Sequence, residues 1–178
     1  MNFEEKTKWP NPNVPFSCAV IATVRNEVKS IDSFIDSLLQ QTSPPDEIII
    51  VDGESTDGTN ERLQFYADNA KITLITQNCN IAQGRNIAIT AANSLIIAST
   101  DAGCIVDTQW LEEITKPFKD ASPPDVVAGN FGFDCKSSFE EAVVLATNAP
   151  DRTRSEEANF YPSSRSVAFT KAIWEKAK

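Results

Sequence analysis

Carboxylates and an arginine, with small residues between them, stand directly after three apolar segments of this chain. They are Thr23, Val24, Arg25 and Glu27 after the first segment, Asp52 and Glu54 after the second, and Asp101 and Ala102 after the third. Parallel strands bring their carboxyl ends to one edge of a sheet, and open α/β proteins bind ligands there. Four carboxylates beside one arginine need a balancing cation or hydrogen-bond donors. A divalent cation that bridges the phosphates of a ligand meets this need, because Mg²⁺ and Mn²⁺ prefer oxygen ligands.

Residues 48–59, IIIVDGESTDGT, are the most informative of these segments. An apolar run rich in β-branched residues ends on Asp52 and is followed by small and polar residues. A carboxylate at such a strand end is placed to recognise a nucleotide base or sugar. The same residue types are common in turns and caps, so a strand followed by a capped helix is the alternative. Glu27 at a helix start, Glu54 in an exposed turn and Arg85 in a surface ion pair have similar alternatives.

Composition excludes several classes of function. The 178 residues suit one domain with a sizeable core, and the net charge of −9 argues against a nucleic-acid or anionic-membrane surface. Without histidine, the chain has neither Ser-His-Asp nor Cys-His chemistry. The four widely spaced cysteines form no metal-binding pair and are expected to be reduced thiols of a cytoplasmic protein. The amino terminus does not read as a signal peptide, and no apolar run approaches the roughly 20 residues that span a bilayer.

Apolar periodicity predicts an alternation of strands and helices. The expected strands are 16–22, 46–51, 71–76, 95–100 and 165–169. The expected helices are 30–41, 56–69, 80–93, one capped by Asp107, 137–147 and a last one over 171–178, with a polar loop over 148–163. This alternation predicts βαβ units, and hence an α/β, doubly wound, mostly parallel sheet with helices on both faces. The apolar stripes of the helices, which include Leu39, Phe65 and Trp110, are expected to face the core.

Two common phosphate-binding loops are absent from the sequence. The segment ATVRNE stands where a dinucleotide-binding GxGxxG would follow the first strand, and no GxxxxGK[ST] occurs. A sugar-nucleotide pyrophosphorylase shares the α/β architecture but needs a glycine-rich, basic loop after the first strand, which VIATVRNE does not supply. A different kind of nucleotide site is therefore needed.

Four segments, in this order and spacing, resemble the family 2 glycosyltransferases of the GT-A fold: VIATVRNE, IIIVDGESTDGT, NIAQGRNIAI and STDAGCIVDTQWL. The resemblance covers nearly the whole chain from Cys18 onward and implies a Rossmann-like GT-A domain over 16–178, after a lead over 1–15. It implies that the chain binds a nucleoside-diphosphate sugar, expected to be a UDP-sugar. The sugar would pass with inversion to an acceptor hydroxyl of a saccharide or a lipid-linked molecule.

The resemblance also implies roles for single residues. Thr23 to Arg25 match a loop that packs around the nucleoside, and Glu27 follows the asparagine typical of that loop. Asp52 matches an aspartate that recognises the base, usually uracil, by accepting a hydrogen bond from its N–H. Arg85 matches a basic residue near the nucleotide and its phosphates. Glu54 is kept as a further candidate for the same site.

The DxD motif of the family is incomplete in this chain. Asp101 matches its first aspartate, which faces the ribose and the metal–diphosphate, and Ala102 follows, but Gly103 replaces the second aspartate, the firmest metal ligand. Cys104 is a poor ligand for a hard cation, and Asp107 is better explained as a helix cap. We therefore expect a divalent cation, Mn²⁺ or Mg²⁺, to depend on Asp101, waters and the diphosphate.

The resemblance places the catalytic base in an acidic motif that would follow Lys178, because SSRSVAFTKAIWEKAK resembles the strand and helix before that motif. We therefore expect a domain that is incomplete at its C-terminus and binds the nucleotide but transfers sugar poorly. The expected location is the cytoplasm, including the inner membrane face if a region outside this chain binds there. The alternative is a non-catalytic nucleotide-binding or assembly module with the same fold.

Overall fold

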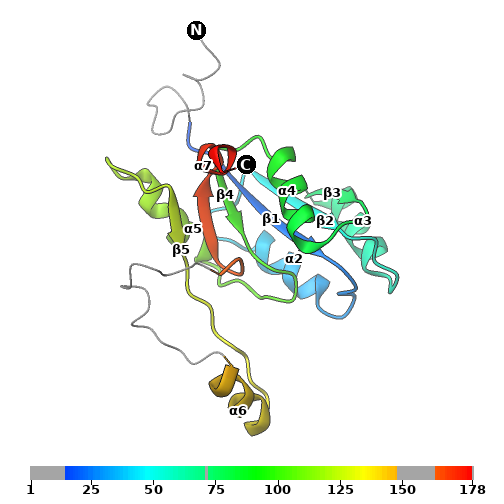
Figure 1. Cartoon of the computed structure of the whole chain (residues 1–178). Coiled ribbons are helices and arrows are strands. Elements are labelled where there is room, and N and C mark those ends of the chain that lie inside the picture. The colour runs from blue at the N-terminus through cyan, green and yellow to red at the C-terminus, as the bar shows by residue number, and fades with distance from the viewer. Residues whose placement is uncertain (1–14, 71, 148–162, 178) are drawn as a thin grey trace.

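The computed structural model describes residues 15–70, 72–147 and 163–177, so almost all of the lead, most of the predicted loop over 148–163, and Lys178 lie outside the described residues. A six-stranded sheet in the order β3-β2-β1-β4-β6-β5 forms the centre of the molecule (Figure 1). The strands are β1 (Cys18–Val24), β2 (Glu47–Asp52), β3 (Ile72–Thr76), β4 (Ile96–Ser99), β5 (Val126–Ala128) and β6 (Val167–Thr170). Neighbouring strands β3, β2, β1 and β4 are parallel, whereas β6 is antiparallel to both β4 and β5. The predicted mostly parallel α/β sheet is confirmed, and the short β5 is a strand that we did not predict.

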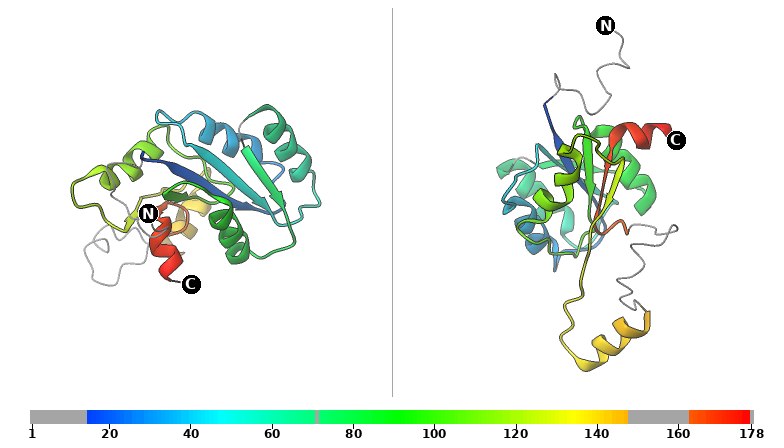
Figure 2. Two further views of the ribbon diagram at one scale, coloured as in Figure 1. Left: turned by 90° about the horizontal axis from the view of Figure 1, so that it is seen from above. Right: turned by 90° about the vertical axis from the view of Figure 1, so that its left-hand side faces the viewer.

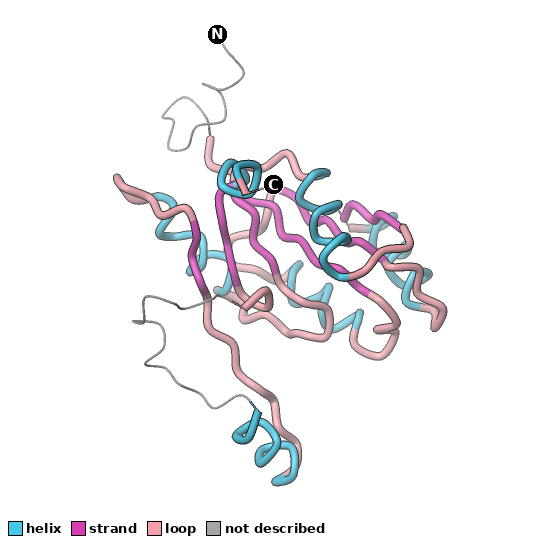
Figure 3. Tube along the Cα trace, in the orientation of Figure 1, coloured by secondary structure: helices cyan, strands magenta, loops and turns pink. Residues whose placement is uncertain are grey.

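Helices cover both faces of this sheet, as Figure 3 shows. They are α2 (Ile31–Leu39), α3 (Thr59–Asn69), α4 (Ile81–Ala91), α5 (Trp110–Thr115), the 3₁₀ helix η1 (Lys116–Lys119), α6 (Ser138–Thr147) and α7 (Lys171–Lys176). Each predicted helix is present, with ends that differ by a few residues. Among the described residues, none of the helices combines the length and the apolar character needed to cross a bilayer.

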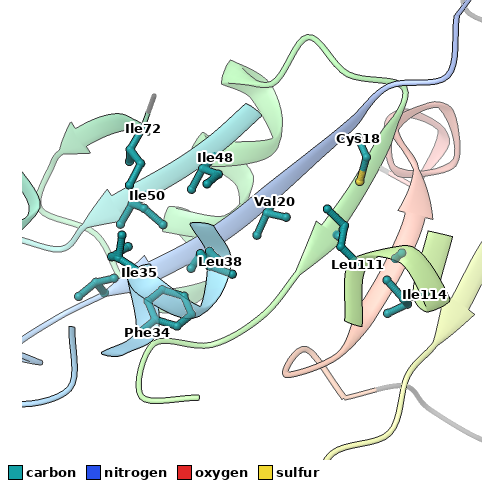
Figure 4. Packing of buried hydrophobic residues seen from close by; sticks show 14 of the residues in the cluster. Cys18, Val20, Phe34, Ile35, Leu38, Ile48, Ile50, Ile72, Leu111 and Ile114 are labelled. Carbon is teal, nitrogen blue, oxygen red and sulfur yellow. The ribbon is translucent and has the colours of Figure 1, made fainter. Parts of the chain in front are cut away.

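Alternate residues of the central strands supply two apolar cores, because successive side chains of a strand point to opposite faces. On one face, Val20 and Ile50 pack with Phe34 of α2 and with residues of α3 and α5 (Figure 4). On the other face, Ile21 and Ile49 pack with α4, and Trp174 of α7 lies at the edge of that cluster. The two apolar cores hold the sheet between two layers of helices. This packing fixes the carboxyl ends of β1, β2 and β4 at one edge.

Two side chains predicted to face the core lie at the surface. Leu39, at the end of α2, is 42% exposed, and Phe65 of α3 is 54% exposed, whereas Leu63 is fully buried. The Phe65 ring instead contacts the Arg62 guanidinium, 5.7 Å from the ring centre, and meets Tyr66 edge to face. Trp110 is half-buried, and its indole N–H donates to Ser166 Oγ at 3.0 Å.

Helix α6 stands away from the sheet in Figure 1 and in the right-hand view of Figure 2. Its predicted N-terminal cap is formed by Ser137 Oγ, which accepts the backbone N–H of Glu140 at 3.2 Å. The Glu140 carboxylate completes the turn by accepting the N–H of Lys136 rather than that of Ser137. The lining of the cavity described below includes no residue of α6.

Candidate functional site

A cavity of about 750 Å³ lies at the carboxyl ends of the parallel strands, beside the first turn of α4. Its lining residues come from the ends of β1, β2 and β4, from α4 and from the loop before α4: Thr23, Val24, Arg25, Glu27, Gly53, Cys79, Asn80, Ile81, Ala82, Arg85, Asp101 and Ala102. Seven of the nine predicted site residues are therefore brought together, and the two that do not line the cavity are Asp52 and Glu54. The expected convergence of strands β1, β2 and β4 at one edge accounts for most of this set.

The loop after β1 is held in place by side chains of residues 52–59. Successive backbone N–H groups of this loop donate to three of them: Asn26 to Ser55 Oγ at 2.9 Å, Glu27 to Thr59 Oγ1 at 2.8 Å, and Val28 to Asp57 Oδ2 at 3.1 Å. In return, Asn26 Oδ1 accepts the backbone N–H of Thr56 at 2.8 Å. Asn26 has a φ of 57°, a left-handed conformation that asparagine tolerates. The small polar residues of the second segment thus build the wall that carries Arg25 and Glu27.

Asp52 lies beneath this loop and is fully buried. Its Oδ1 accepts the hydroxyl of Ser55 and, at 3.2 Å, the backbone N–H of the same residue. Its Oδ2 accepts the side-chain amide of Asn60 at 2.8 Å. The carboxylate that we predicted to bind the base is therefore enclosed and engaged in hydrogen bonds of the chain itself, while its neighbour Gly53 lines the cavity.

Glu54 is exposed and has a φ of 58°, in the turn that leads from β2 toward α3. The structural alternative, an exposed turn carboxylate, describes its position. Glu27 remains at the cavity, where its Oε2 accepts the hydroxyl of Ser30 at 2.6 Å and its backbone oxygen accepts the N–H of Ile31 at 2.8 Å. Glu27 therefore both lines the cavity and supports the start of α2.

Arg85 projects from α4 to the end of β4. Its Nη2 donates to Asp101 Oδ1 at 2.6 Å and to Ser164 Oγ at 2.8 Å. The side chains of Arg85 and Asp101 are 27% and 32% exposed, so the ion pair stays in contact with solvent. Arg85 thus forms an ion pair, as the alternative to a nucleotide-binding role predicted. The pair nevertheless lies within the cavity lining and not on the outer surface.

The N-terminus of α4 faces the cavity through Asn80, Ile81 and Ala82. The predicted cap is confirmed, because Asn80 Oδ1 accepts the N–H of Gln83 at 2.9 Å and Gln83 Oε1 accepts the N–H of Asn80 at 3.0 Å. A Cβ at Gly84 would lie 2.5 Å from Thr23 Cγ2, so glycine lets α4 approach the end of β1. This approach places positive helix-end dipoles at the cavity, where they favour anions.

Five lining residues were not among the predicted site residues: Gly53, Cys79, Asn80, Ile81 and Ala82. Burial, together with the charge of Asp52, raises the pKa of the Cys79 thiol, so this wall stays neutral. Asn80 carried a usable signal, since a helix cap after a parallel strand lies at the ligand edge. Ser164, which fixes Arg85, gave none, because it is 79 residues away in the chain.

The residues around Asp101 fit a bound divalent cation poorly. The described residues contain no group of three or more carboxylate, cysteine or histidine side chains that could hold a metal ion. Gly103 contributes no side chain and has a φ of 85°, and Asp107 accepts the N–H of Gln109 at 2.9 Å in the turn before α5. One oxygen of Asp101 already binds the Arg85 guanidinium, so this chain offers a single shared carboxylate where the motif has two.

Comparison with known proteins agrees with this architecture. The chain is 30% identical to glycosyltransferase AglE of Haloferax volcanii over 125 residues, which are 67% of this chain and 40% of that protein. It superposes on the mannosyltransferase PcManGT from Pyrobaculum calidifontis, solved with GDP-Man and Mn²⁺, with a TM-score of 0.71 at 23% identity, over 94% of this chain and 48% of that one. It superposes on S. aureus TarS in complex with UDP with a TM-score of 0.67 at 18% identity, over 91% and 49% of the two chains.

These solved structures show the GT-A fold, and this chain spans about half of each, or less than half of its curated relatives. The model of the family described as glycosyl transferase family 2 matches residues 19–174. This range includes the whole cavity lining and all strands, apart from Cys18 at the start of β1. With its strand-end cavity and GT-A sheet, the chain belongs to glycosyl transferase family 2.

Proposed function

We propose that this chain forms the donor-binding part of an inverting glycosyltransferase that uses a UDP-sugar. The observation that carries the proposal is the cavity at the strand ends, which combines Arg25, Arg85 and the N-terminus of α4. Two guanidinium groups and a helix N-terminus suit a diphosphate, because phosphates are bound by such donors. Cytoplasmic function agrees with the four free cysteines.

The bound nucleotides of similar proteins support the same ligand class. PcManGT was solved with GDP-Man, and TarS with UDP and with UDP-GlcNAc. Uracil is our expectation for this chain on the resemblance of its segments. In the proposal Asp52 acts on the base through the loop it anchors, since Ser55 links it to the backbone of Asn26 beside the cavity.

In an inverting transfer, a carboxylate removes the proton of the acceptor hydroxyl while that oxygen attacks the anomeric carbon. The bond to the diphosphate breaks, and positive groups stabilise the leaving diphosphate. We assign the second task to Arg25 and Arg85, and we assign the base to none of the described carboxylates. The expectation of a base in an acidic motif after Lys178 stays a prediction, as does an acceptor that is a saccharide or lipid-linked.

Isothermal titration calorimetry with UDP, GDP and uridine tests the donor site. We expect micromolar binding of UDP, weaker binding of uridine, and weaker binding of GDP than of UDP. Arg25→Gln should weaken UDP binding at least about tenfold, a loss of about 1.4 kcal/mol. Absence of binding for every nucleotide would refute the proposal.

A non-catalytic assembly module is the second candidate, and one observation favours it. Gly103 occupies the position of the second aspartate of the DxD motif, so the described site lacks a group on which the chemistry of the family depends. A chain that binds no nucleotide, in calorimetry or in thermal-shift assays, would support this candidate.

A further inference from the structure

The guanidinium of Arg85 lies against Asp101, the residue at which we expected a metal ion. Arg85 Nη2 contacts Asp101 Oδ1 at 2.6 Å and is held from the other side by Ser164 Oγ at 2.8 Å. The guanidinium is thus anchored to the end of β4 and to the segment before β6, and it lines the cavity. A positive charge is fixed at the place where the motif of the family would hold Mn²⁺ or Mg²⁺.

Arg85 keeps most of its hydrogen-bonding capacity for a ligand. A guanidinium has five N–H donors, and the two contacts recorded for Arg85 both come from Nη2. The donors on Nε and Nη1 have no partner among the residues that the structure describes. Planar guanidinium groups bind phosphate oxygens in pairs, so Arg85 is suited to hold a diphosphate and Asp101 at the same time.

Arg25 supplies a second positive charge to the same cavity. It is exposed, lines the cavity, and forms no ion pair with any residue in the described ranges. The N-terminus of α4 adds the positive end of a helix of 11 residues. Two guanidinium groups and this helix end together offer charge comparable to that of a divalent cation.

The carboxylates available to a metal ion are few. Gly103 carries none, Cys104 is a soft ligand, and Glu27 Oε2 accepts the hydroxyl of Ser30 at 2.6 Å. Mg²⁺ is held by one or two carboxylates together with phosphates and waters, and the carboxylate at this position, Asp101, already pairs with Arg85. The donor set and the charges therefore point in the same direction.

We infer that, in this chain, Arg85 and Arg25 neutralise the donor's diphosphate in place of a divalent cation, so that the nucleotide binds equally well without metal. The inference rests on the proposed function, since it concerns the diphosphate of the same ligand. It replaces the cation that we expected at Asp101, and it assigns a specific role to the Arg85–Asp101 ion pair. Asp101 positions the guanidinium and offsets its positive charge when the cavity is empty.

Calorimetric titrations of the whole chain with UDP and with GDP, in EDTA and in Mn²⁺ or Mg²⁺, test the inference. We expect dissociation constants in EDTA within about twofold of those with metal, a difference of about 0.4 kcal/mol. Electron paramagnetic resonance should show that added Mn²⁺ stays free in the presence of protein and UDP beyond the Mn²⁺ that UDP binds itself. A dissociation constant at least about tenfold weaker in EDTA would overturn the inference while leaving the proposed function intact. Absence of binding in all buffers would instead refute the proposed function.

Variants of Arg85 separate its role in binding from a role in folding. Arg85→Gln should weaken UDP at least about tenfold and leave uridine unchanged, and Arg85→Lys should recover part of the affinity for UDP. Arg62→Gln is the matched control, because Arg62 pairs with Asp32 on the outer surface and does not line the cavity. Equal losses for UDP and uridine in Arg85→Gln would overturn the inference, since the diphosphate would then not be its target.

Discussion

The side-chain amide of Asn60 donates to Oδ2 of Asp52 at 2.8 Å, which ties the end of β2 to the first turn of α3. The same amide nitrogen also contacts Thr76 Oγ1 at the end of β3. Asp52 is therefore the centre of a junction that joins two strand ends and a helix, beneath the loop that carries Arg25. Asp52 therefore supports the loop at the cavity through Ser55 and does not itself line the cavity.

Removal of this carboxylate should cost stability as well as nucleotide affinity. Asp52→Ala removes a fully buried carboxylate that accepts hydrogen bonds from the half-buried Ser55 and Asn60, which destabilises by about 3 kcal/mol. Urea unfolding followed by circular dichroism measures this loss. The variant Asp52→Asn keeps one acceptor oxygen and should lose less.

Glu61→Ala is the control for this measurement, because Glu61 is exposed and lies in α3 next to Asn60. Its effect should stay within about 0.5 kcal/mol. If Asp52→Ala unfolds at the same urea concentration as the unmodified chain and loses only uridine binding, then Asp52 contacts the base directly, and our assignment of an anchoring role fails.

Gly84→Ala should destabilise the chain although alanine is the better helix former. The added Cβ would lie 2.5 Å from Thr23 Cγ2 and 2.8 Å from Thr23 Oγ1, and β-branched threonine has little freedom to move. Overpacking costs about 1–3 kcal/mol, and a contact as short as 2.5 Å belongs to the upper part of that range, above the roughly 1 kcal/mol gained from helix propensity. Thermal or urea unfolding would measure the difference, and the distorted wall should also weaken UDP binding.

A double-mutant cycle identifies the cause. Thr23→Ala removes both close contacts, so Gly84→Ala should cost less in that background. Gly132→Ala is the matched control, because nothing lies within 4 Å of the position its Cβ would take. Purely additive effects of Thr23→Ala and Gly84→Ala would contradict the steric explanation.

The order of strands and helices could be predicted from the sequence because each central strand is an apolar run bounded by turn residues. Convergence of Thr23, Arg25 and Asp101 then followed from parallel strands sharing an edge. The accessibility of Asp52 could not be predicted, since it depends on Asn60 reaching back from α3. Phe65 misled for a different reason: it lies two residues after the buried Leu63, and residues two apart in a helix face different sides, so only one of them points to the core.

Stability should decline in alkali through Cys18. Burial of this thiol, assisted by the charge of Asp46, raises its pKa from 9.0 to about 12. The folded state therefore holds the proton where the unfolded chain has released it, so the contribution is complete below pH 9 and is lost as the pH rises toward 12. Urea unfolding at a series of pH values should show a falling free energy of unfolding above pH 9.

Cys18→Ala should flatten this alkaline slope, although Tyr66, whose pKa burial and Asp36 raise to about 12, retains its own share. Cys135→Ala, outside both apolar cores, serves as the control and should leave the slope unchanged. An equal slope in the Cys18→Ala variant would show that the buried thiol is not the group that titrates.

Gly103→Asp should convert the site into one that responds to metal. Gly103 has a φ of 85°, which aspartate tolerates at a cost of about 1–2 kcal/mol, and Glu27 Oε2 lies 3.7 Å from the position of the new Cβ. The new carboxylate would stand beside Asp101, and two carboxylates with a diphosphate and water form an oxygen set that Mn²⁺ accepts. Electron paramagnetic resonance should then detect bound Mn²⁺ in the presence of UDP, and EDTA should weaken UDP binding to the variant.

Gly103→Asn has the same shape and backbone demand without the charge, and it should leave both measurements as in the unmodified chain. Equal Mn²⁺ binding by the unmodified chain and by both variants would mean that the existing residues already hold the cation, and that Arg85 does not take its place.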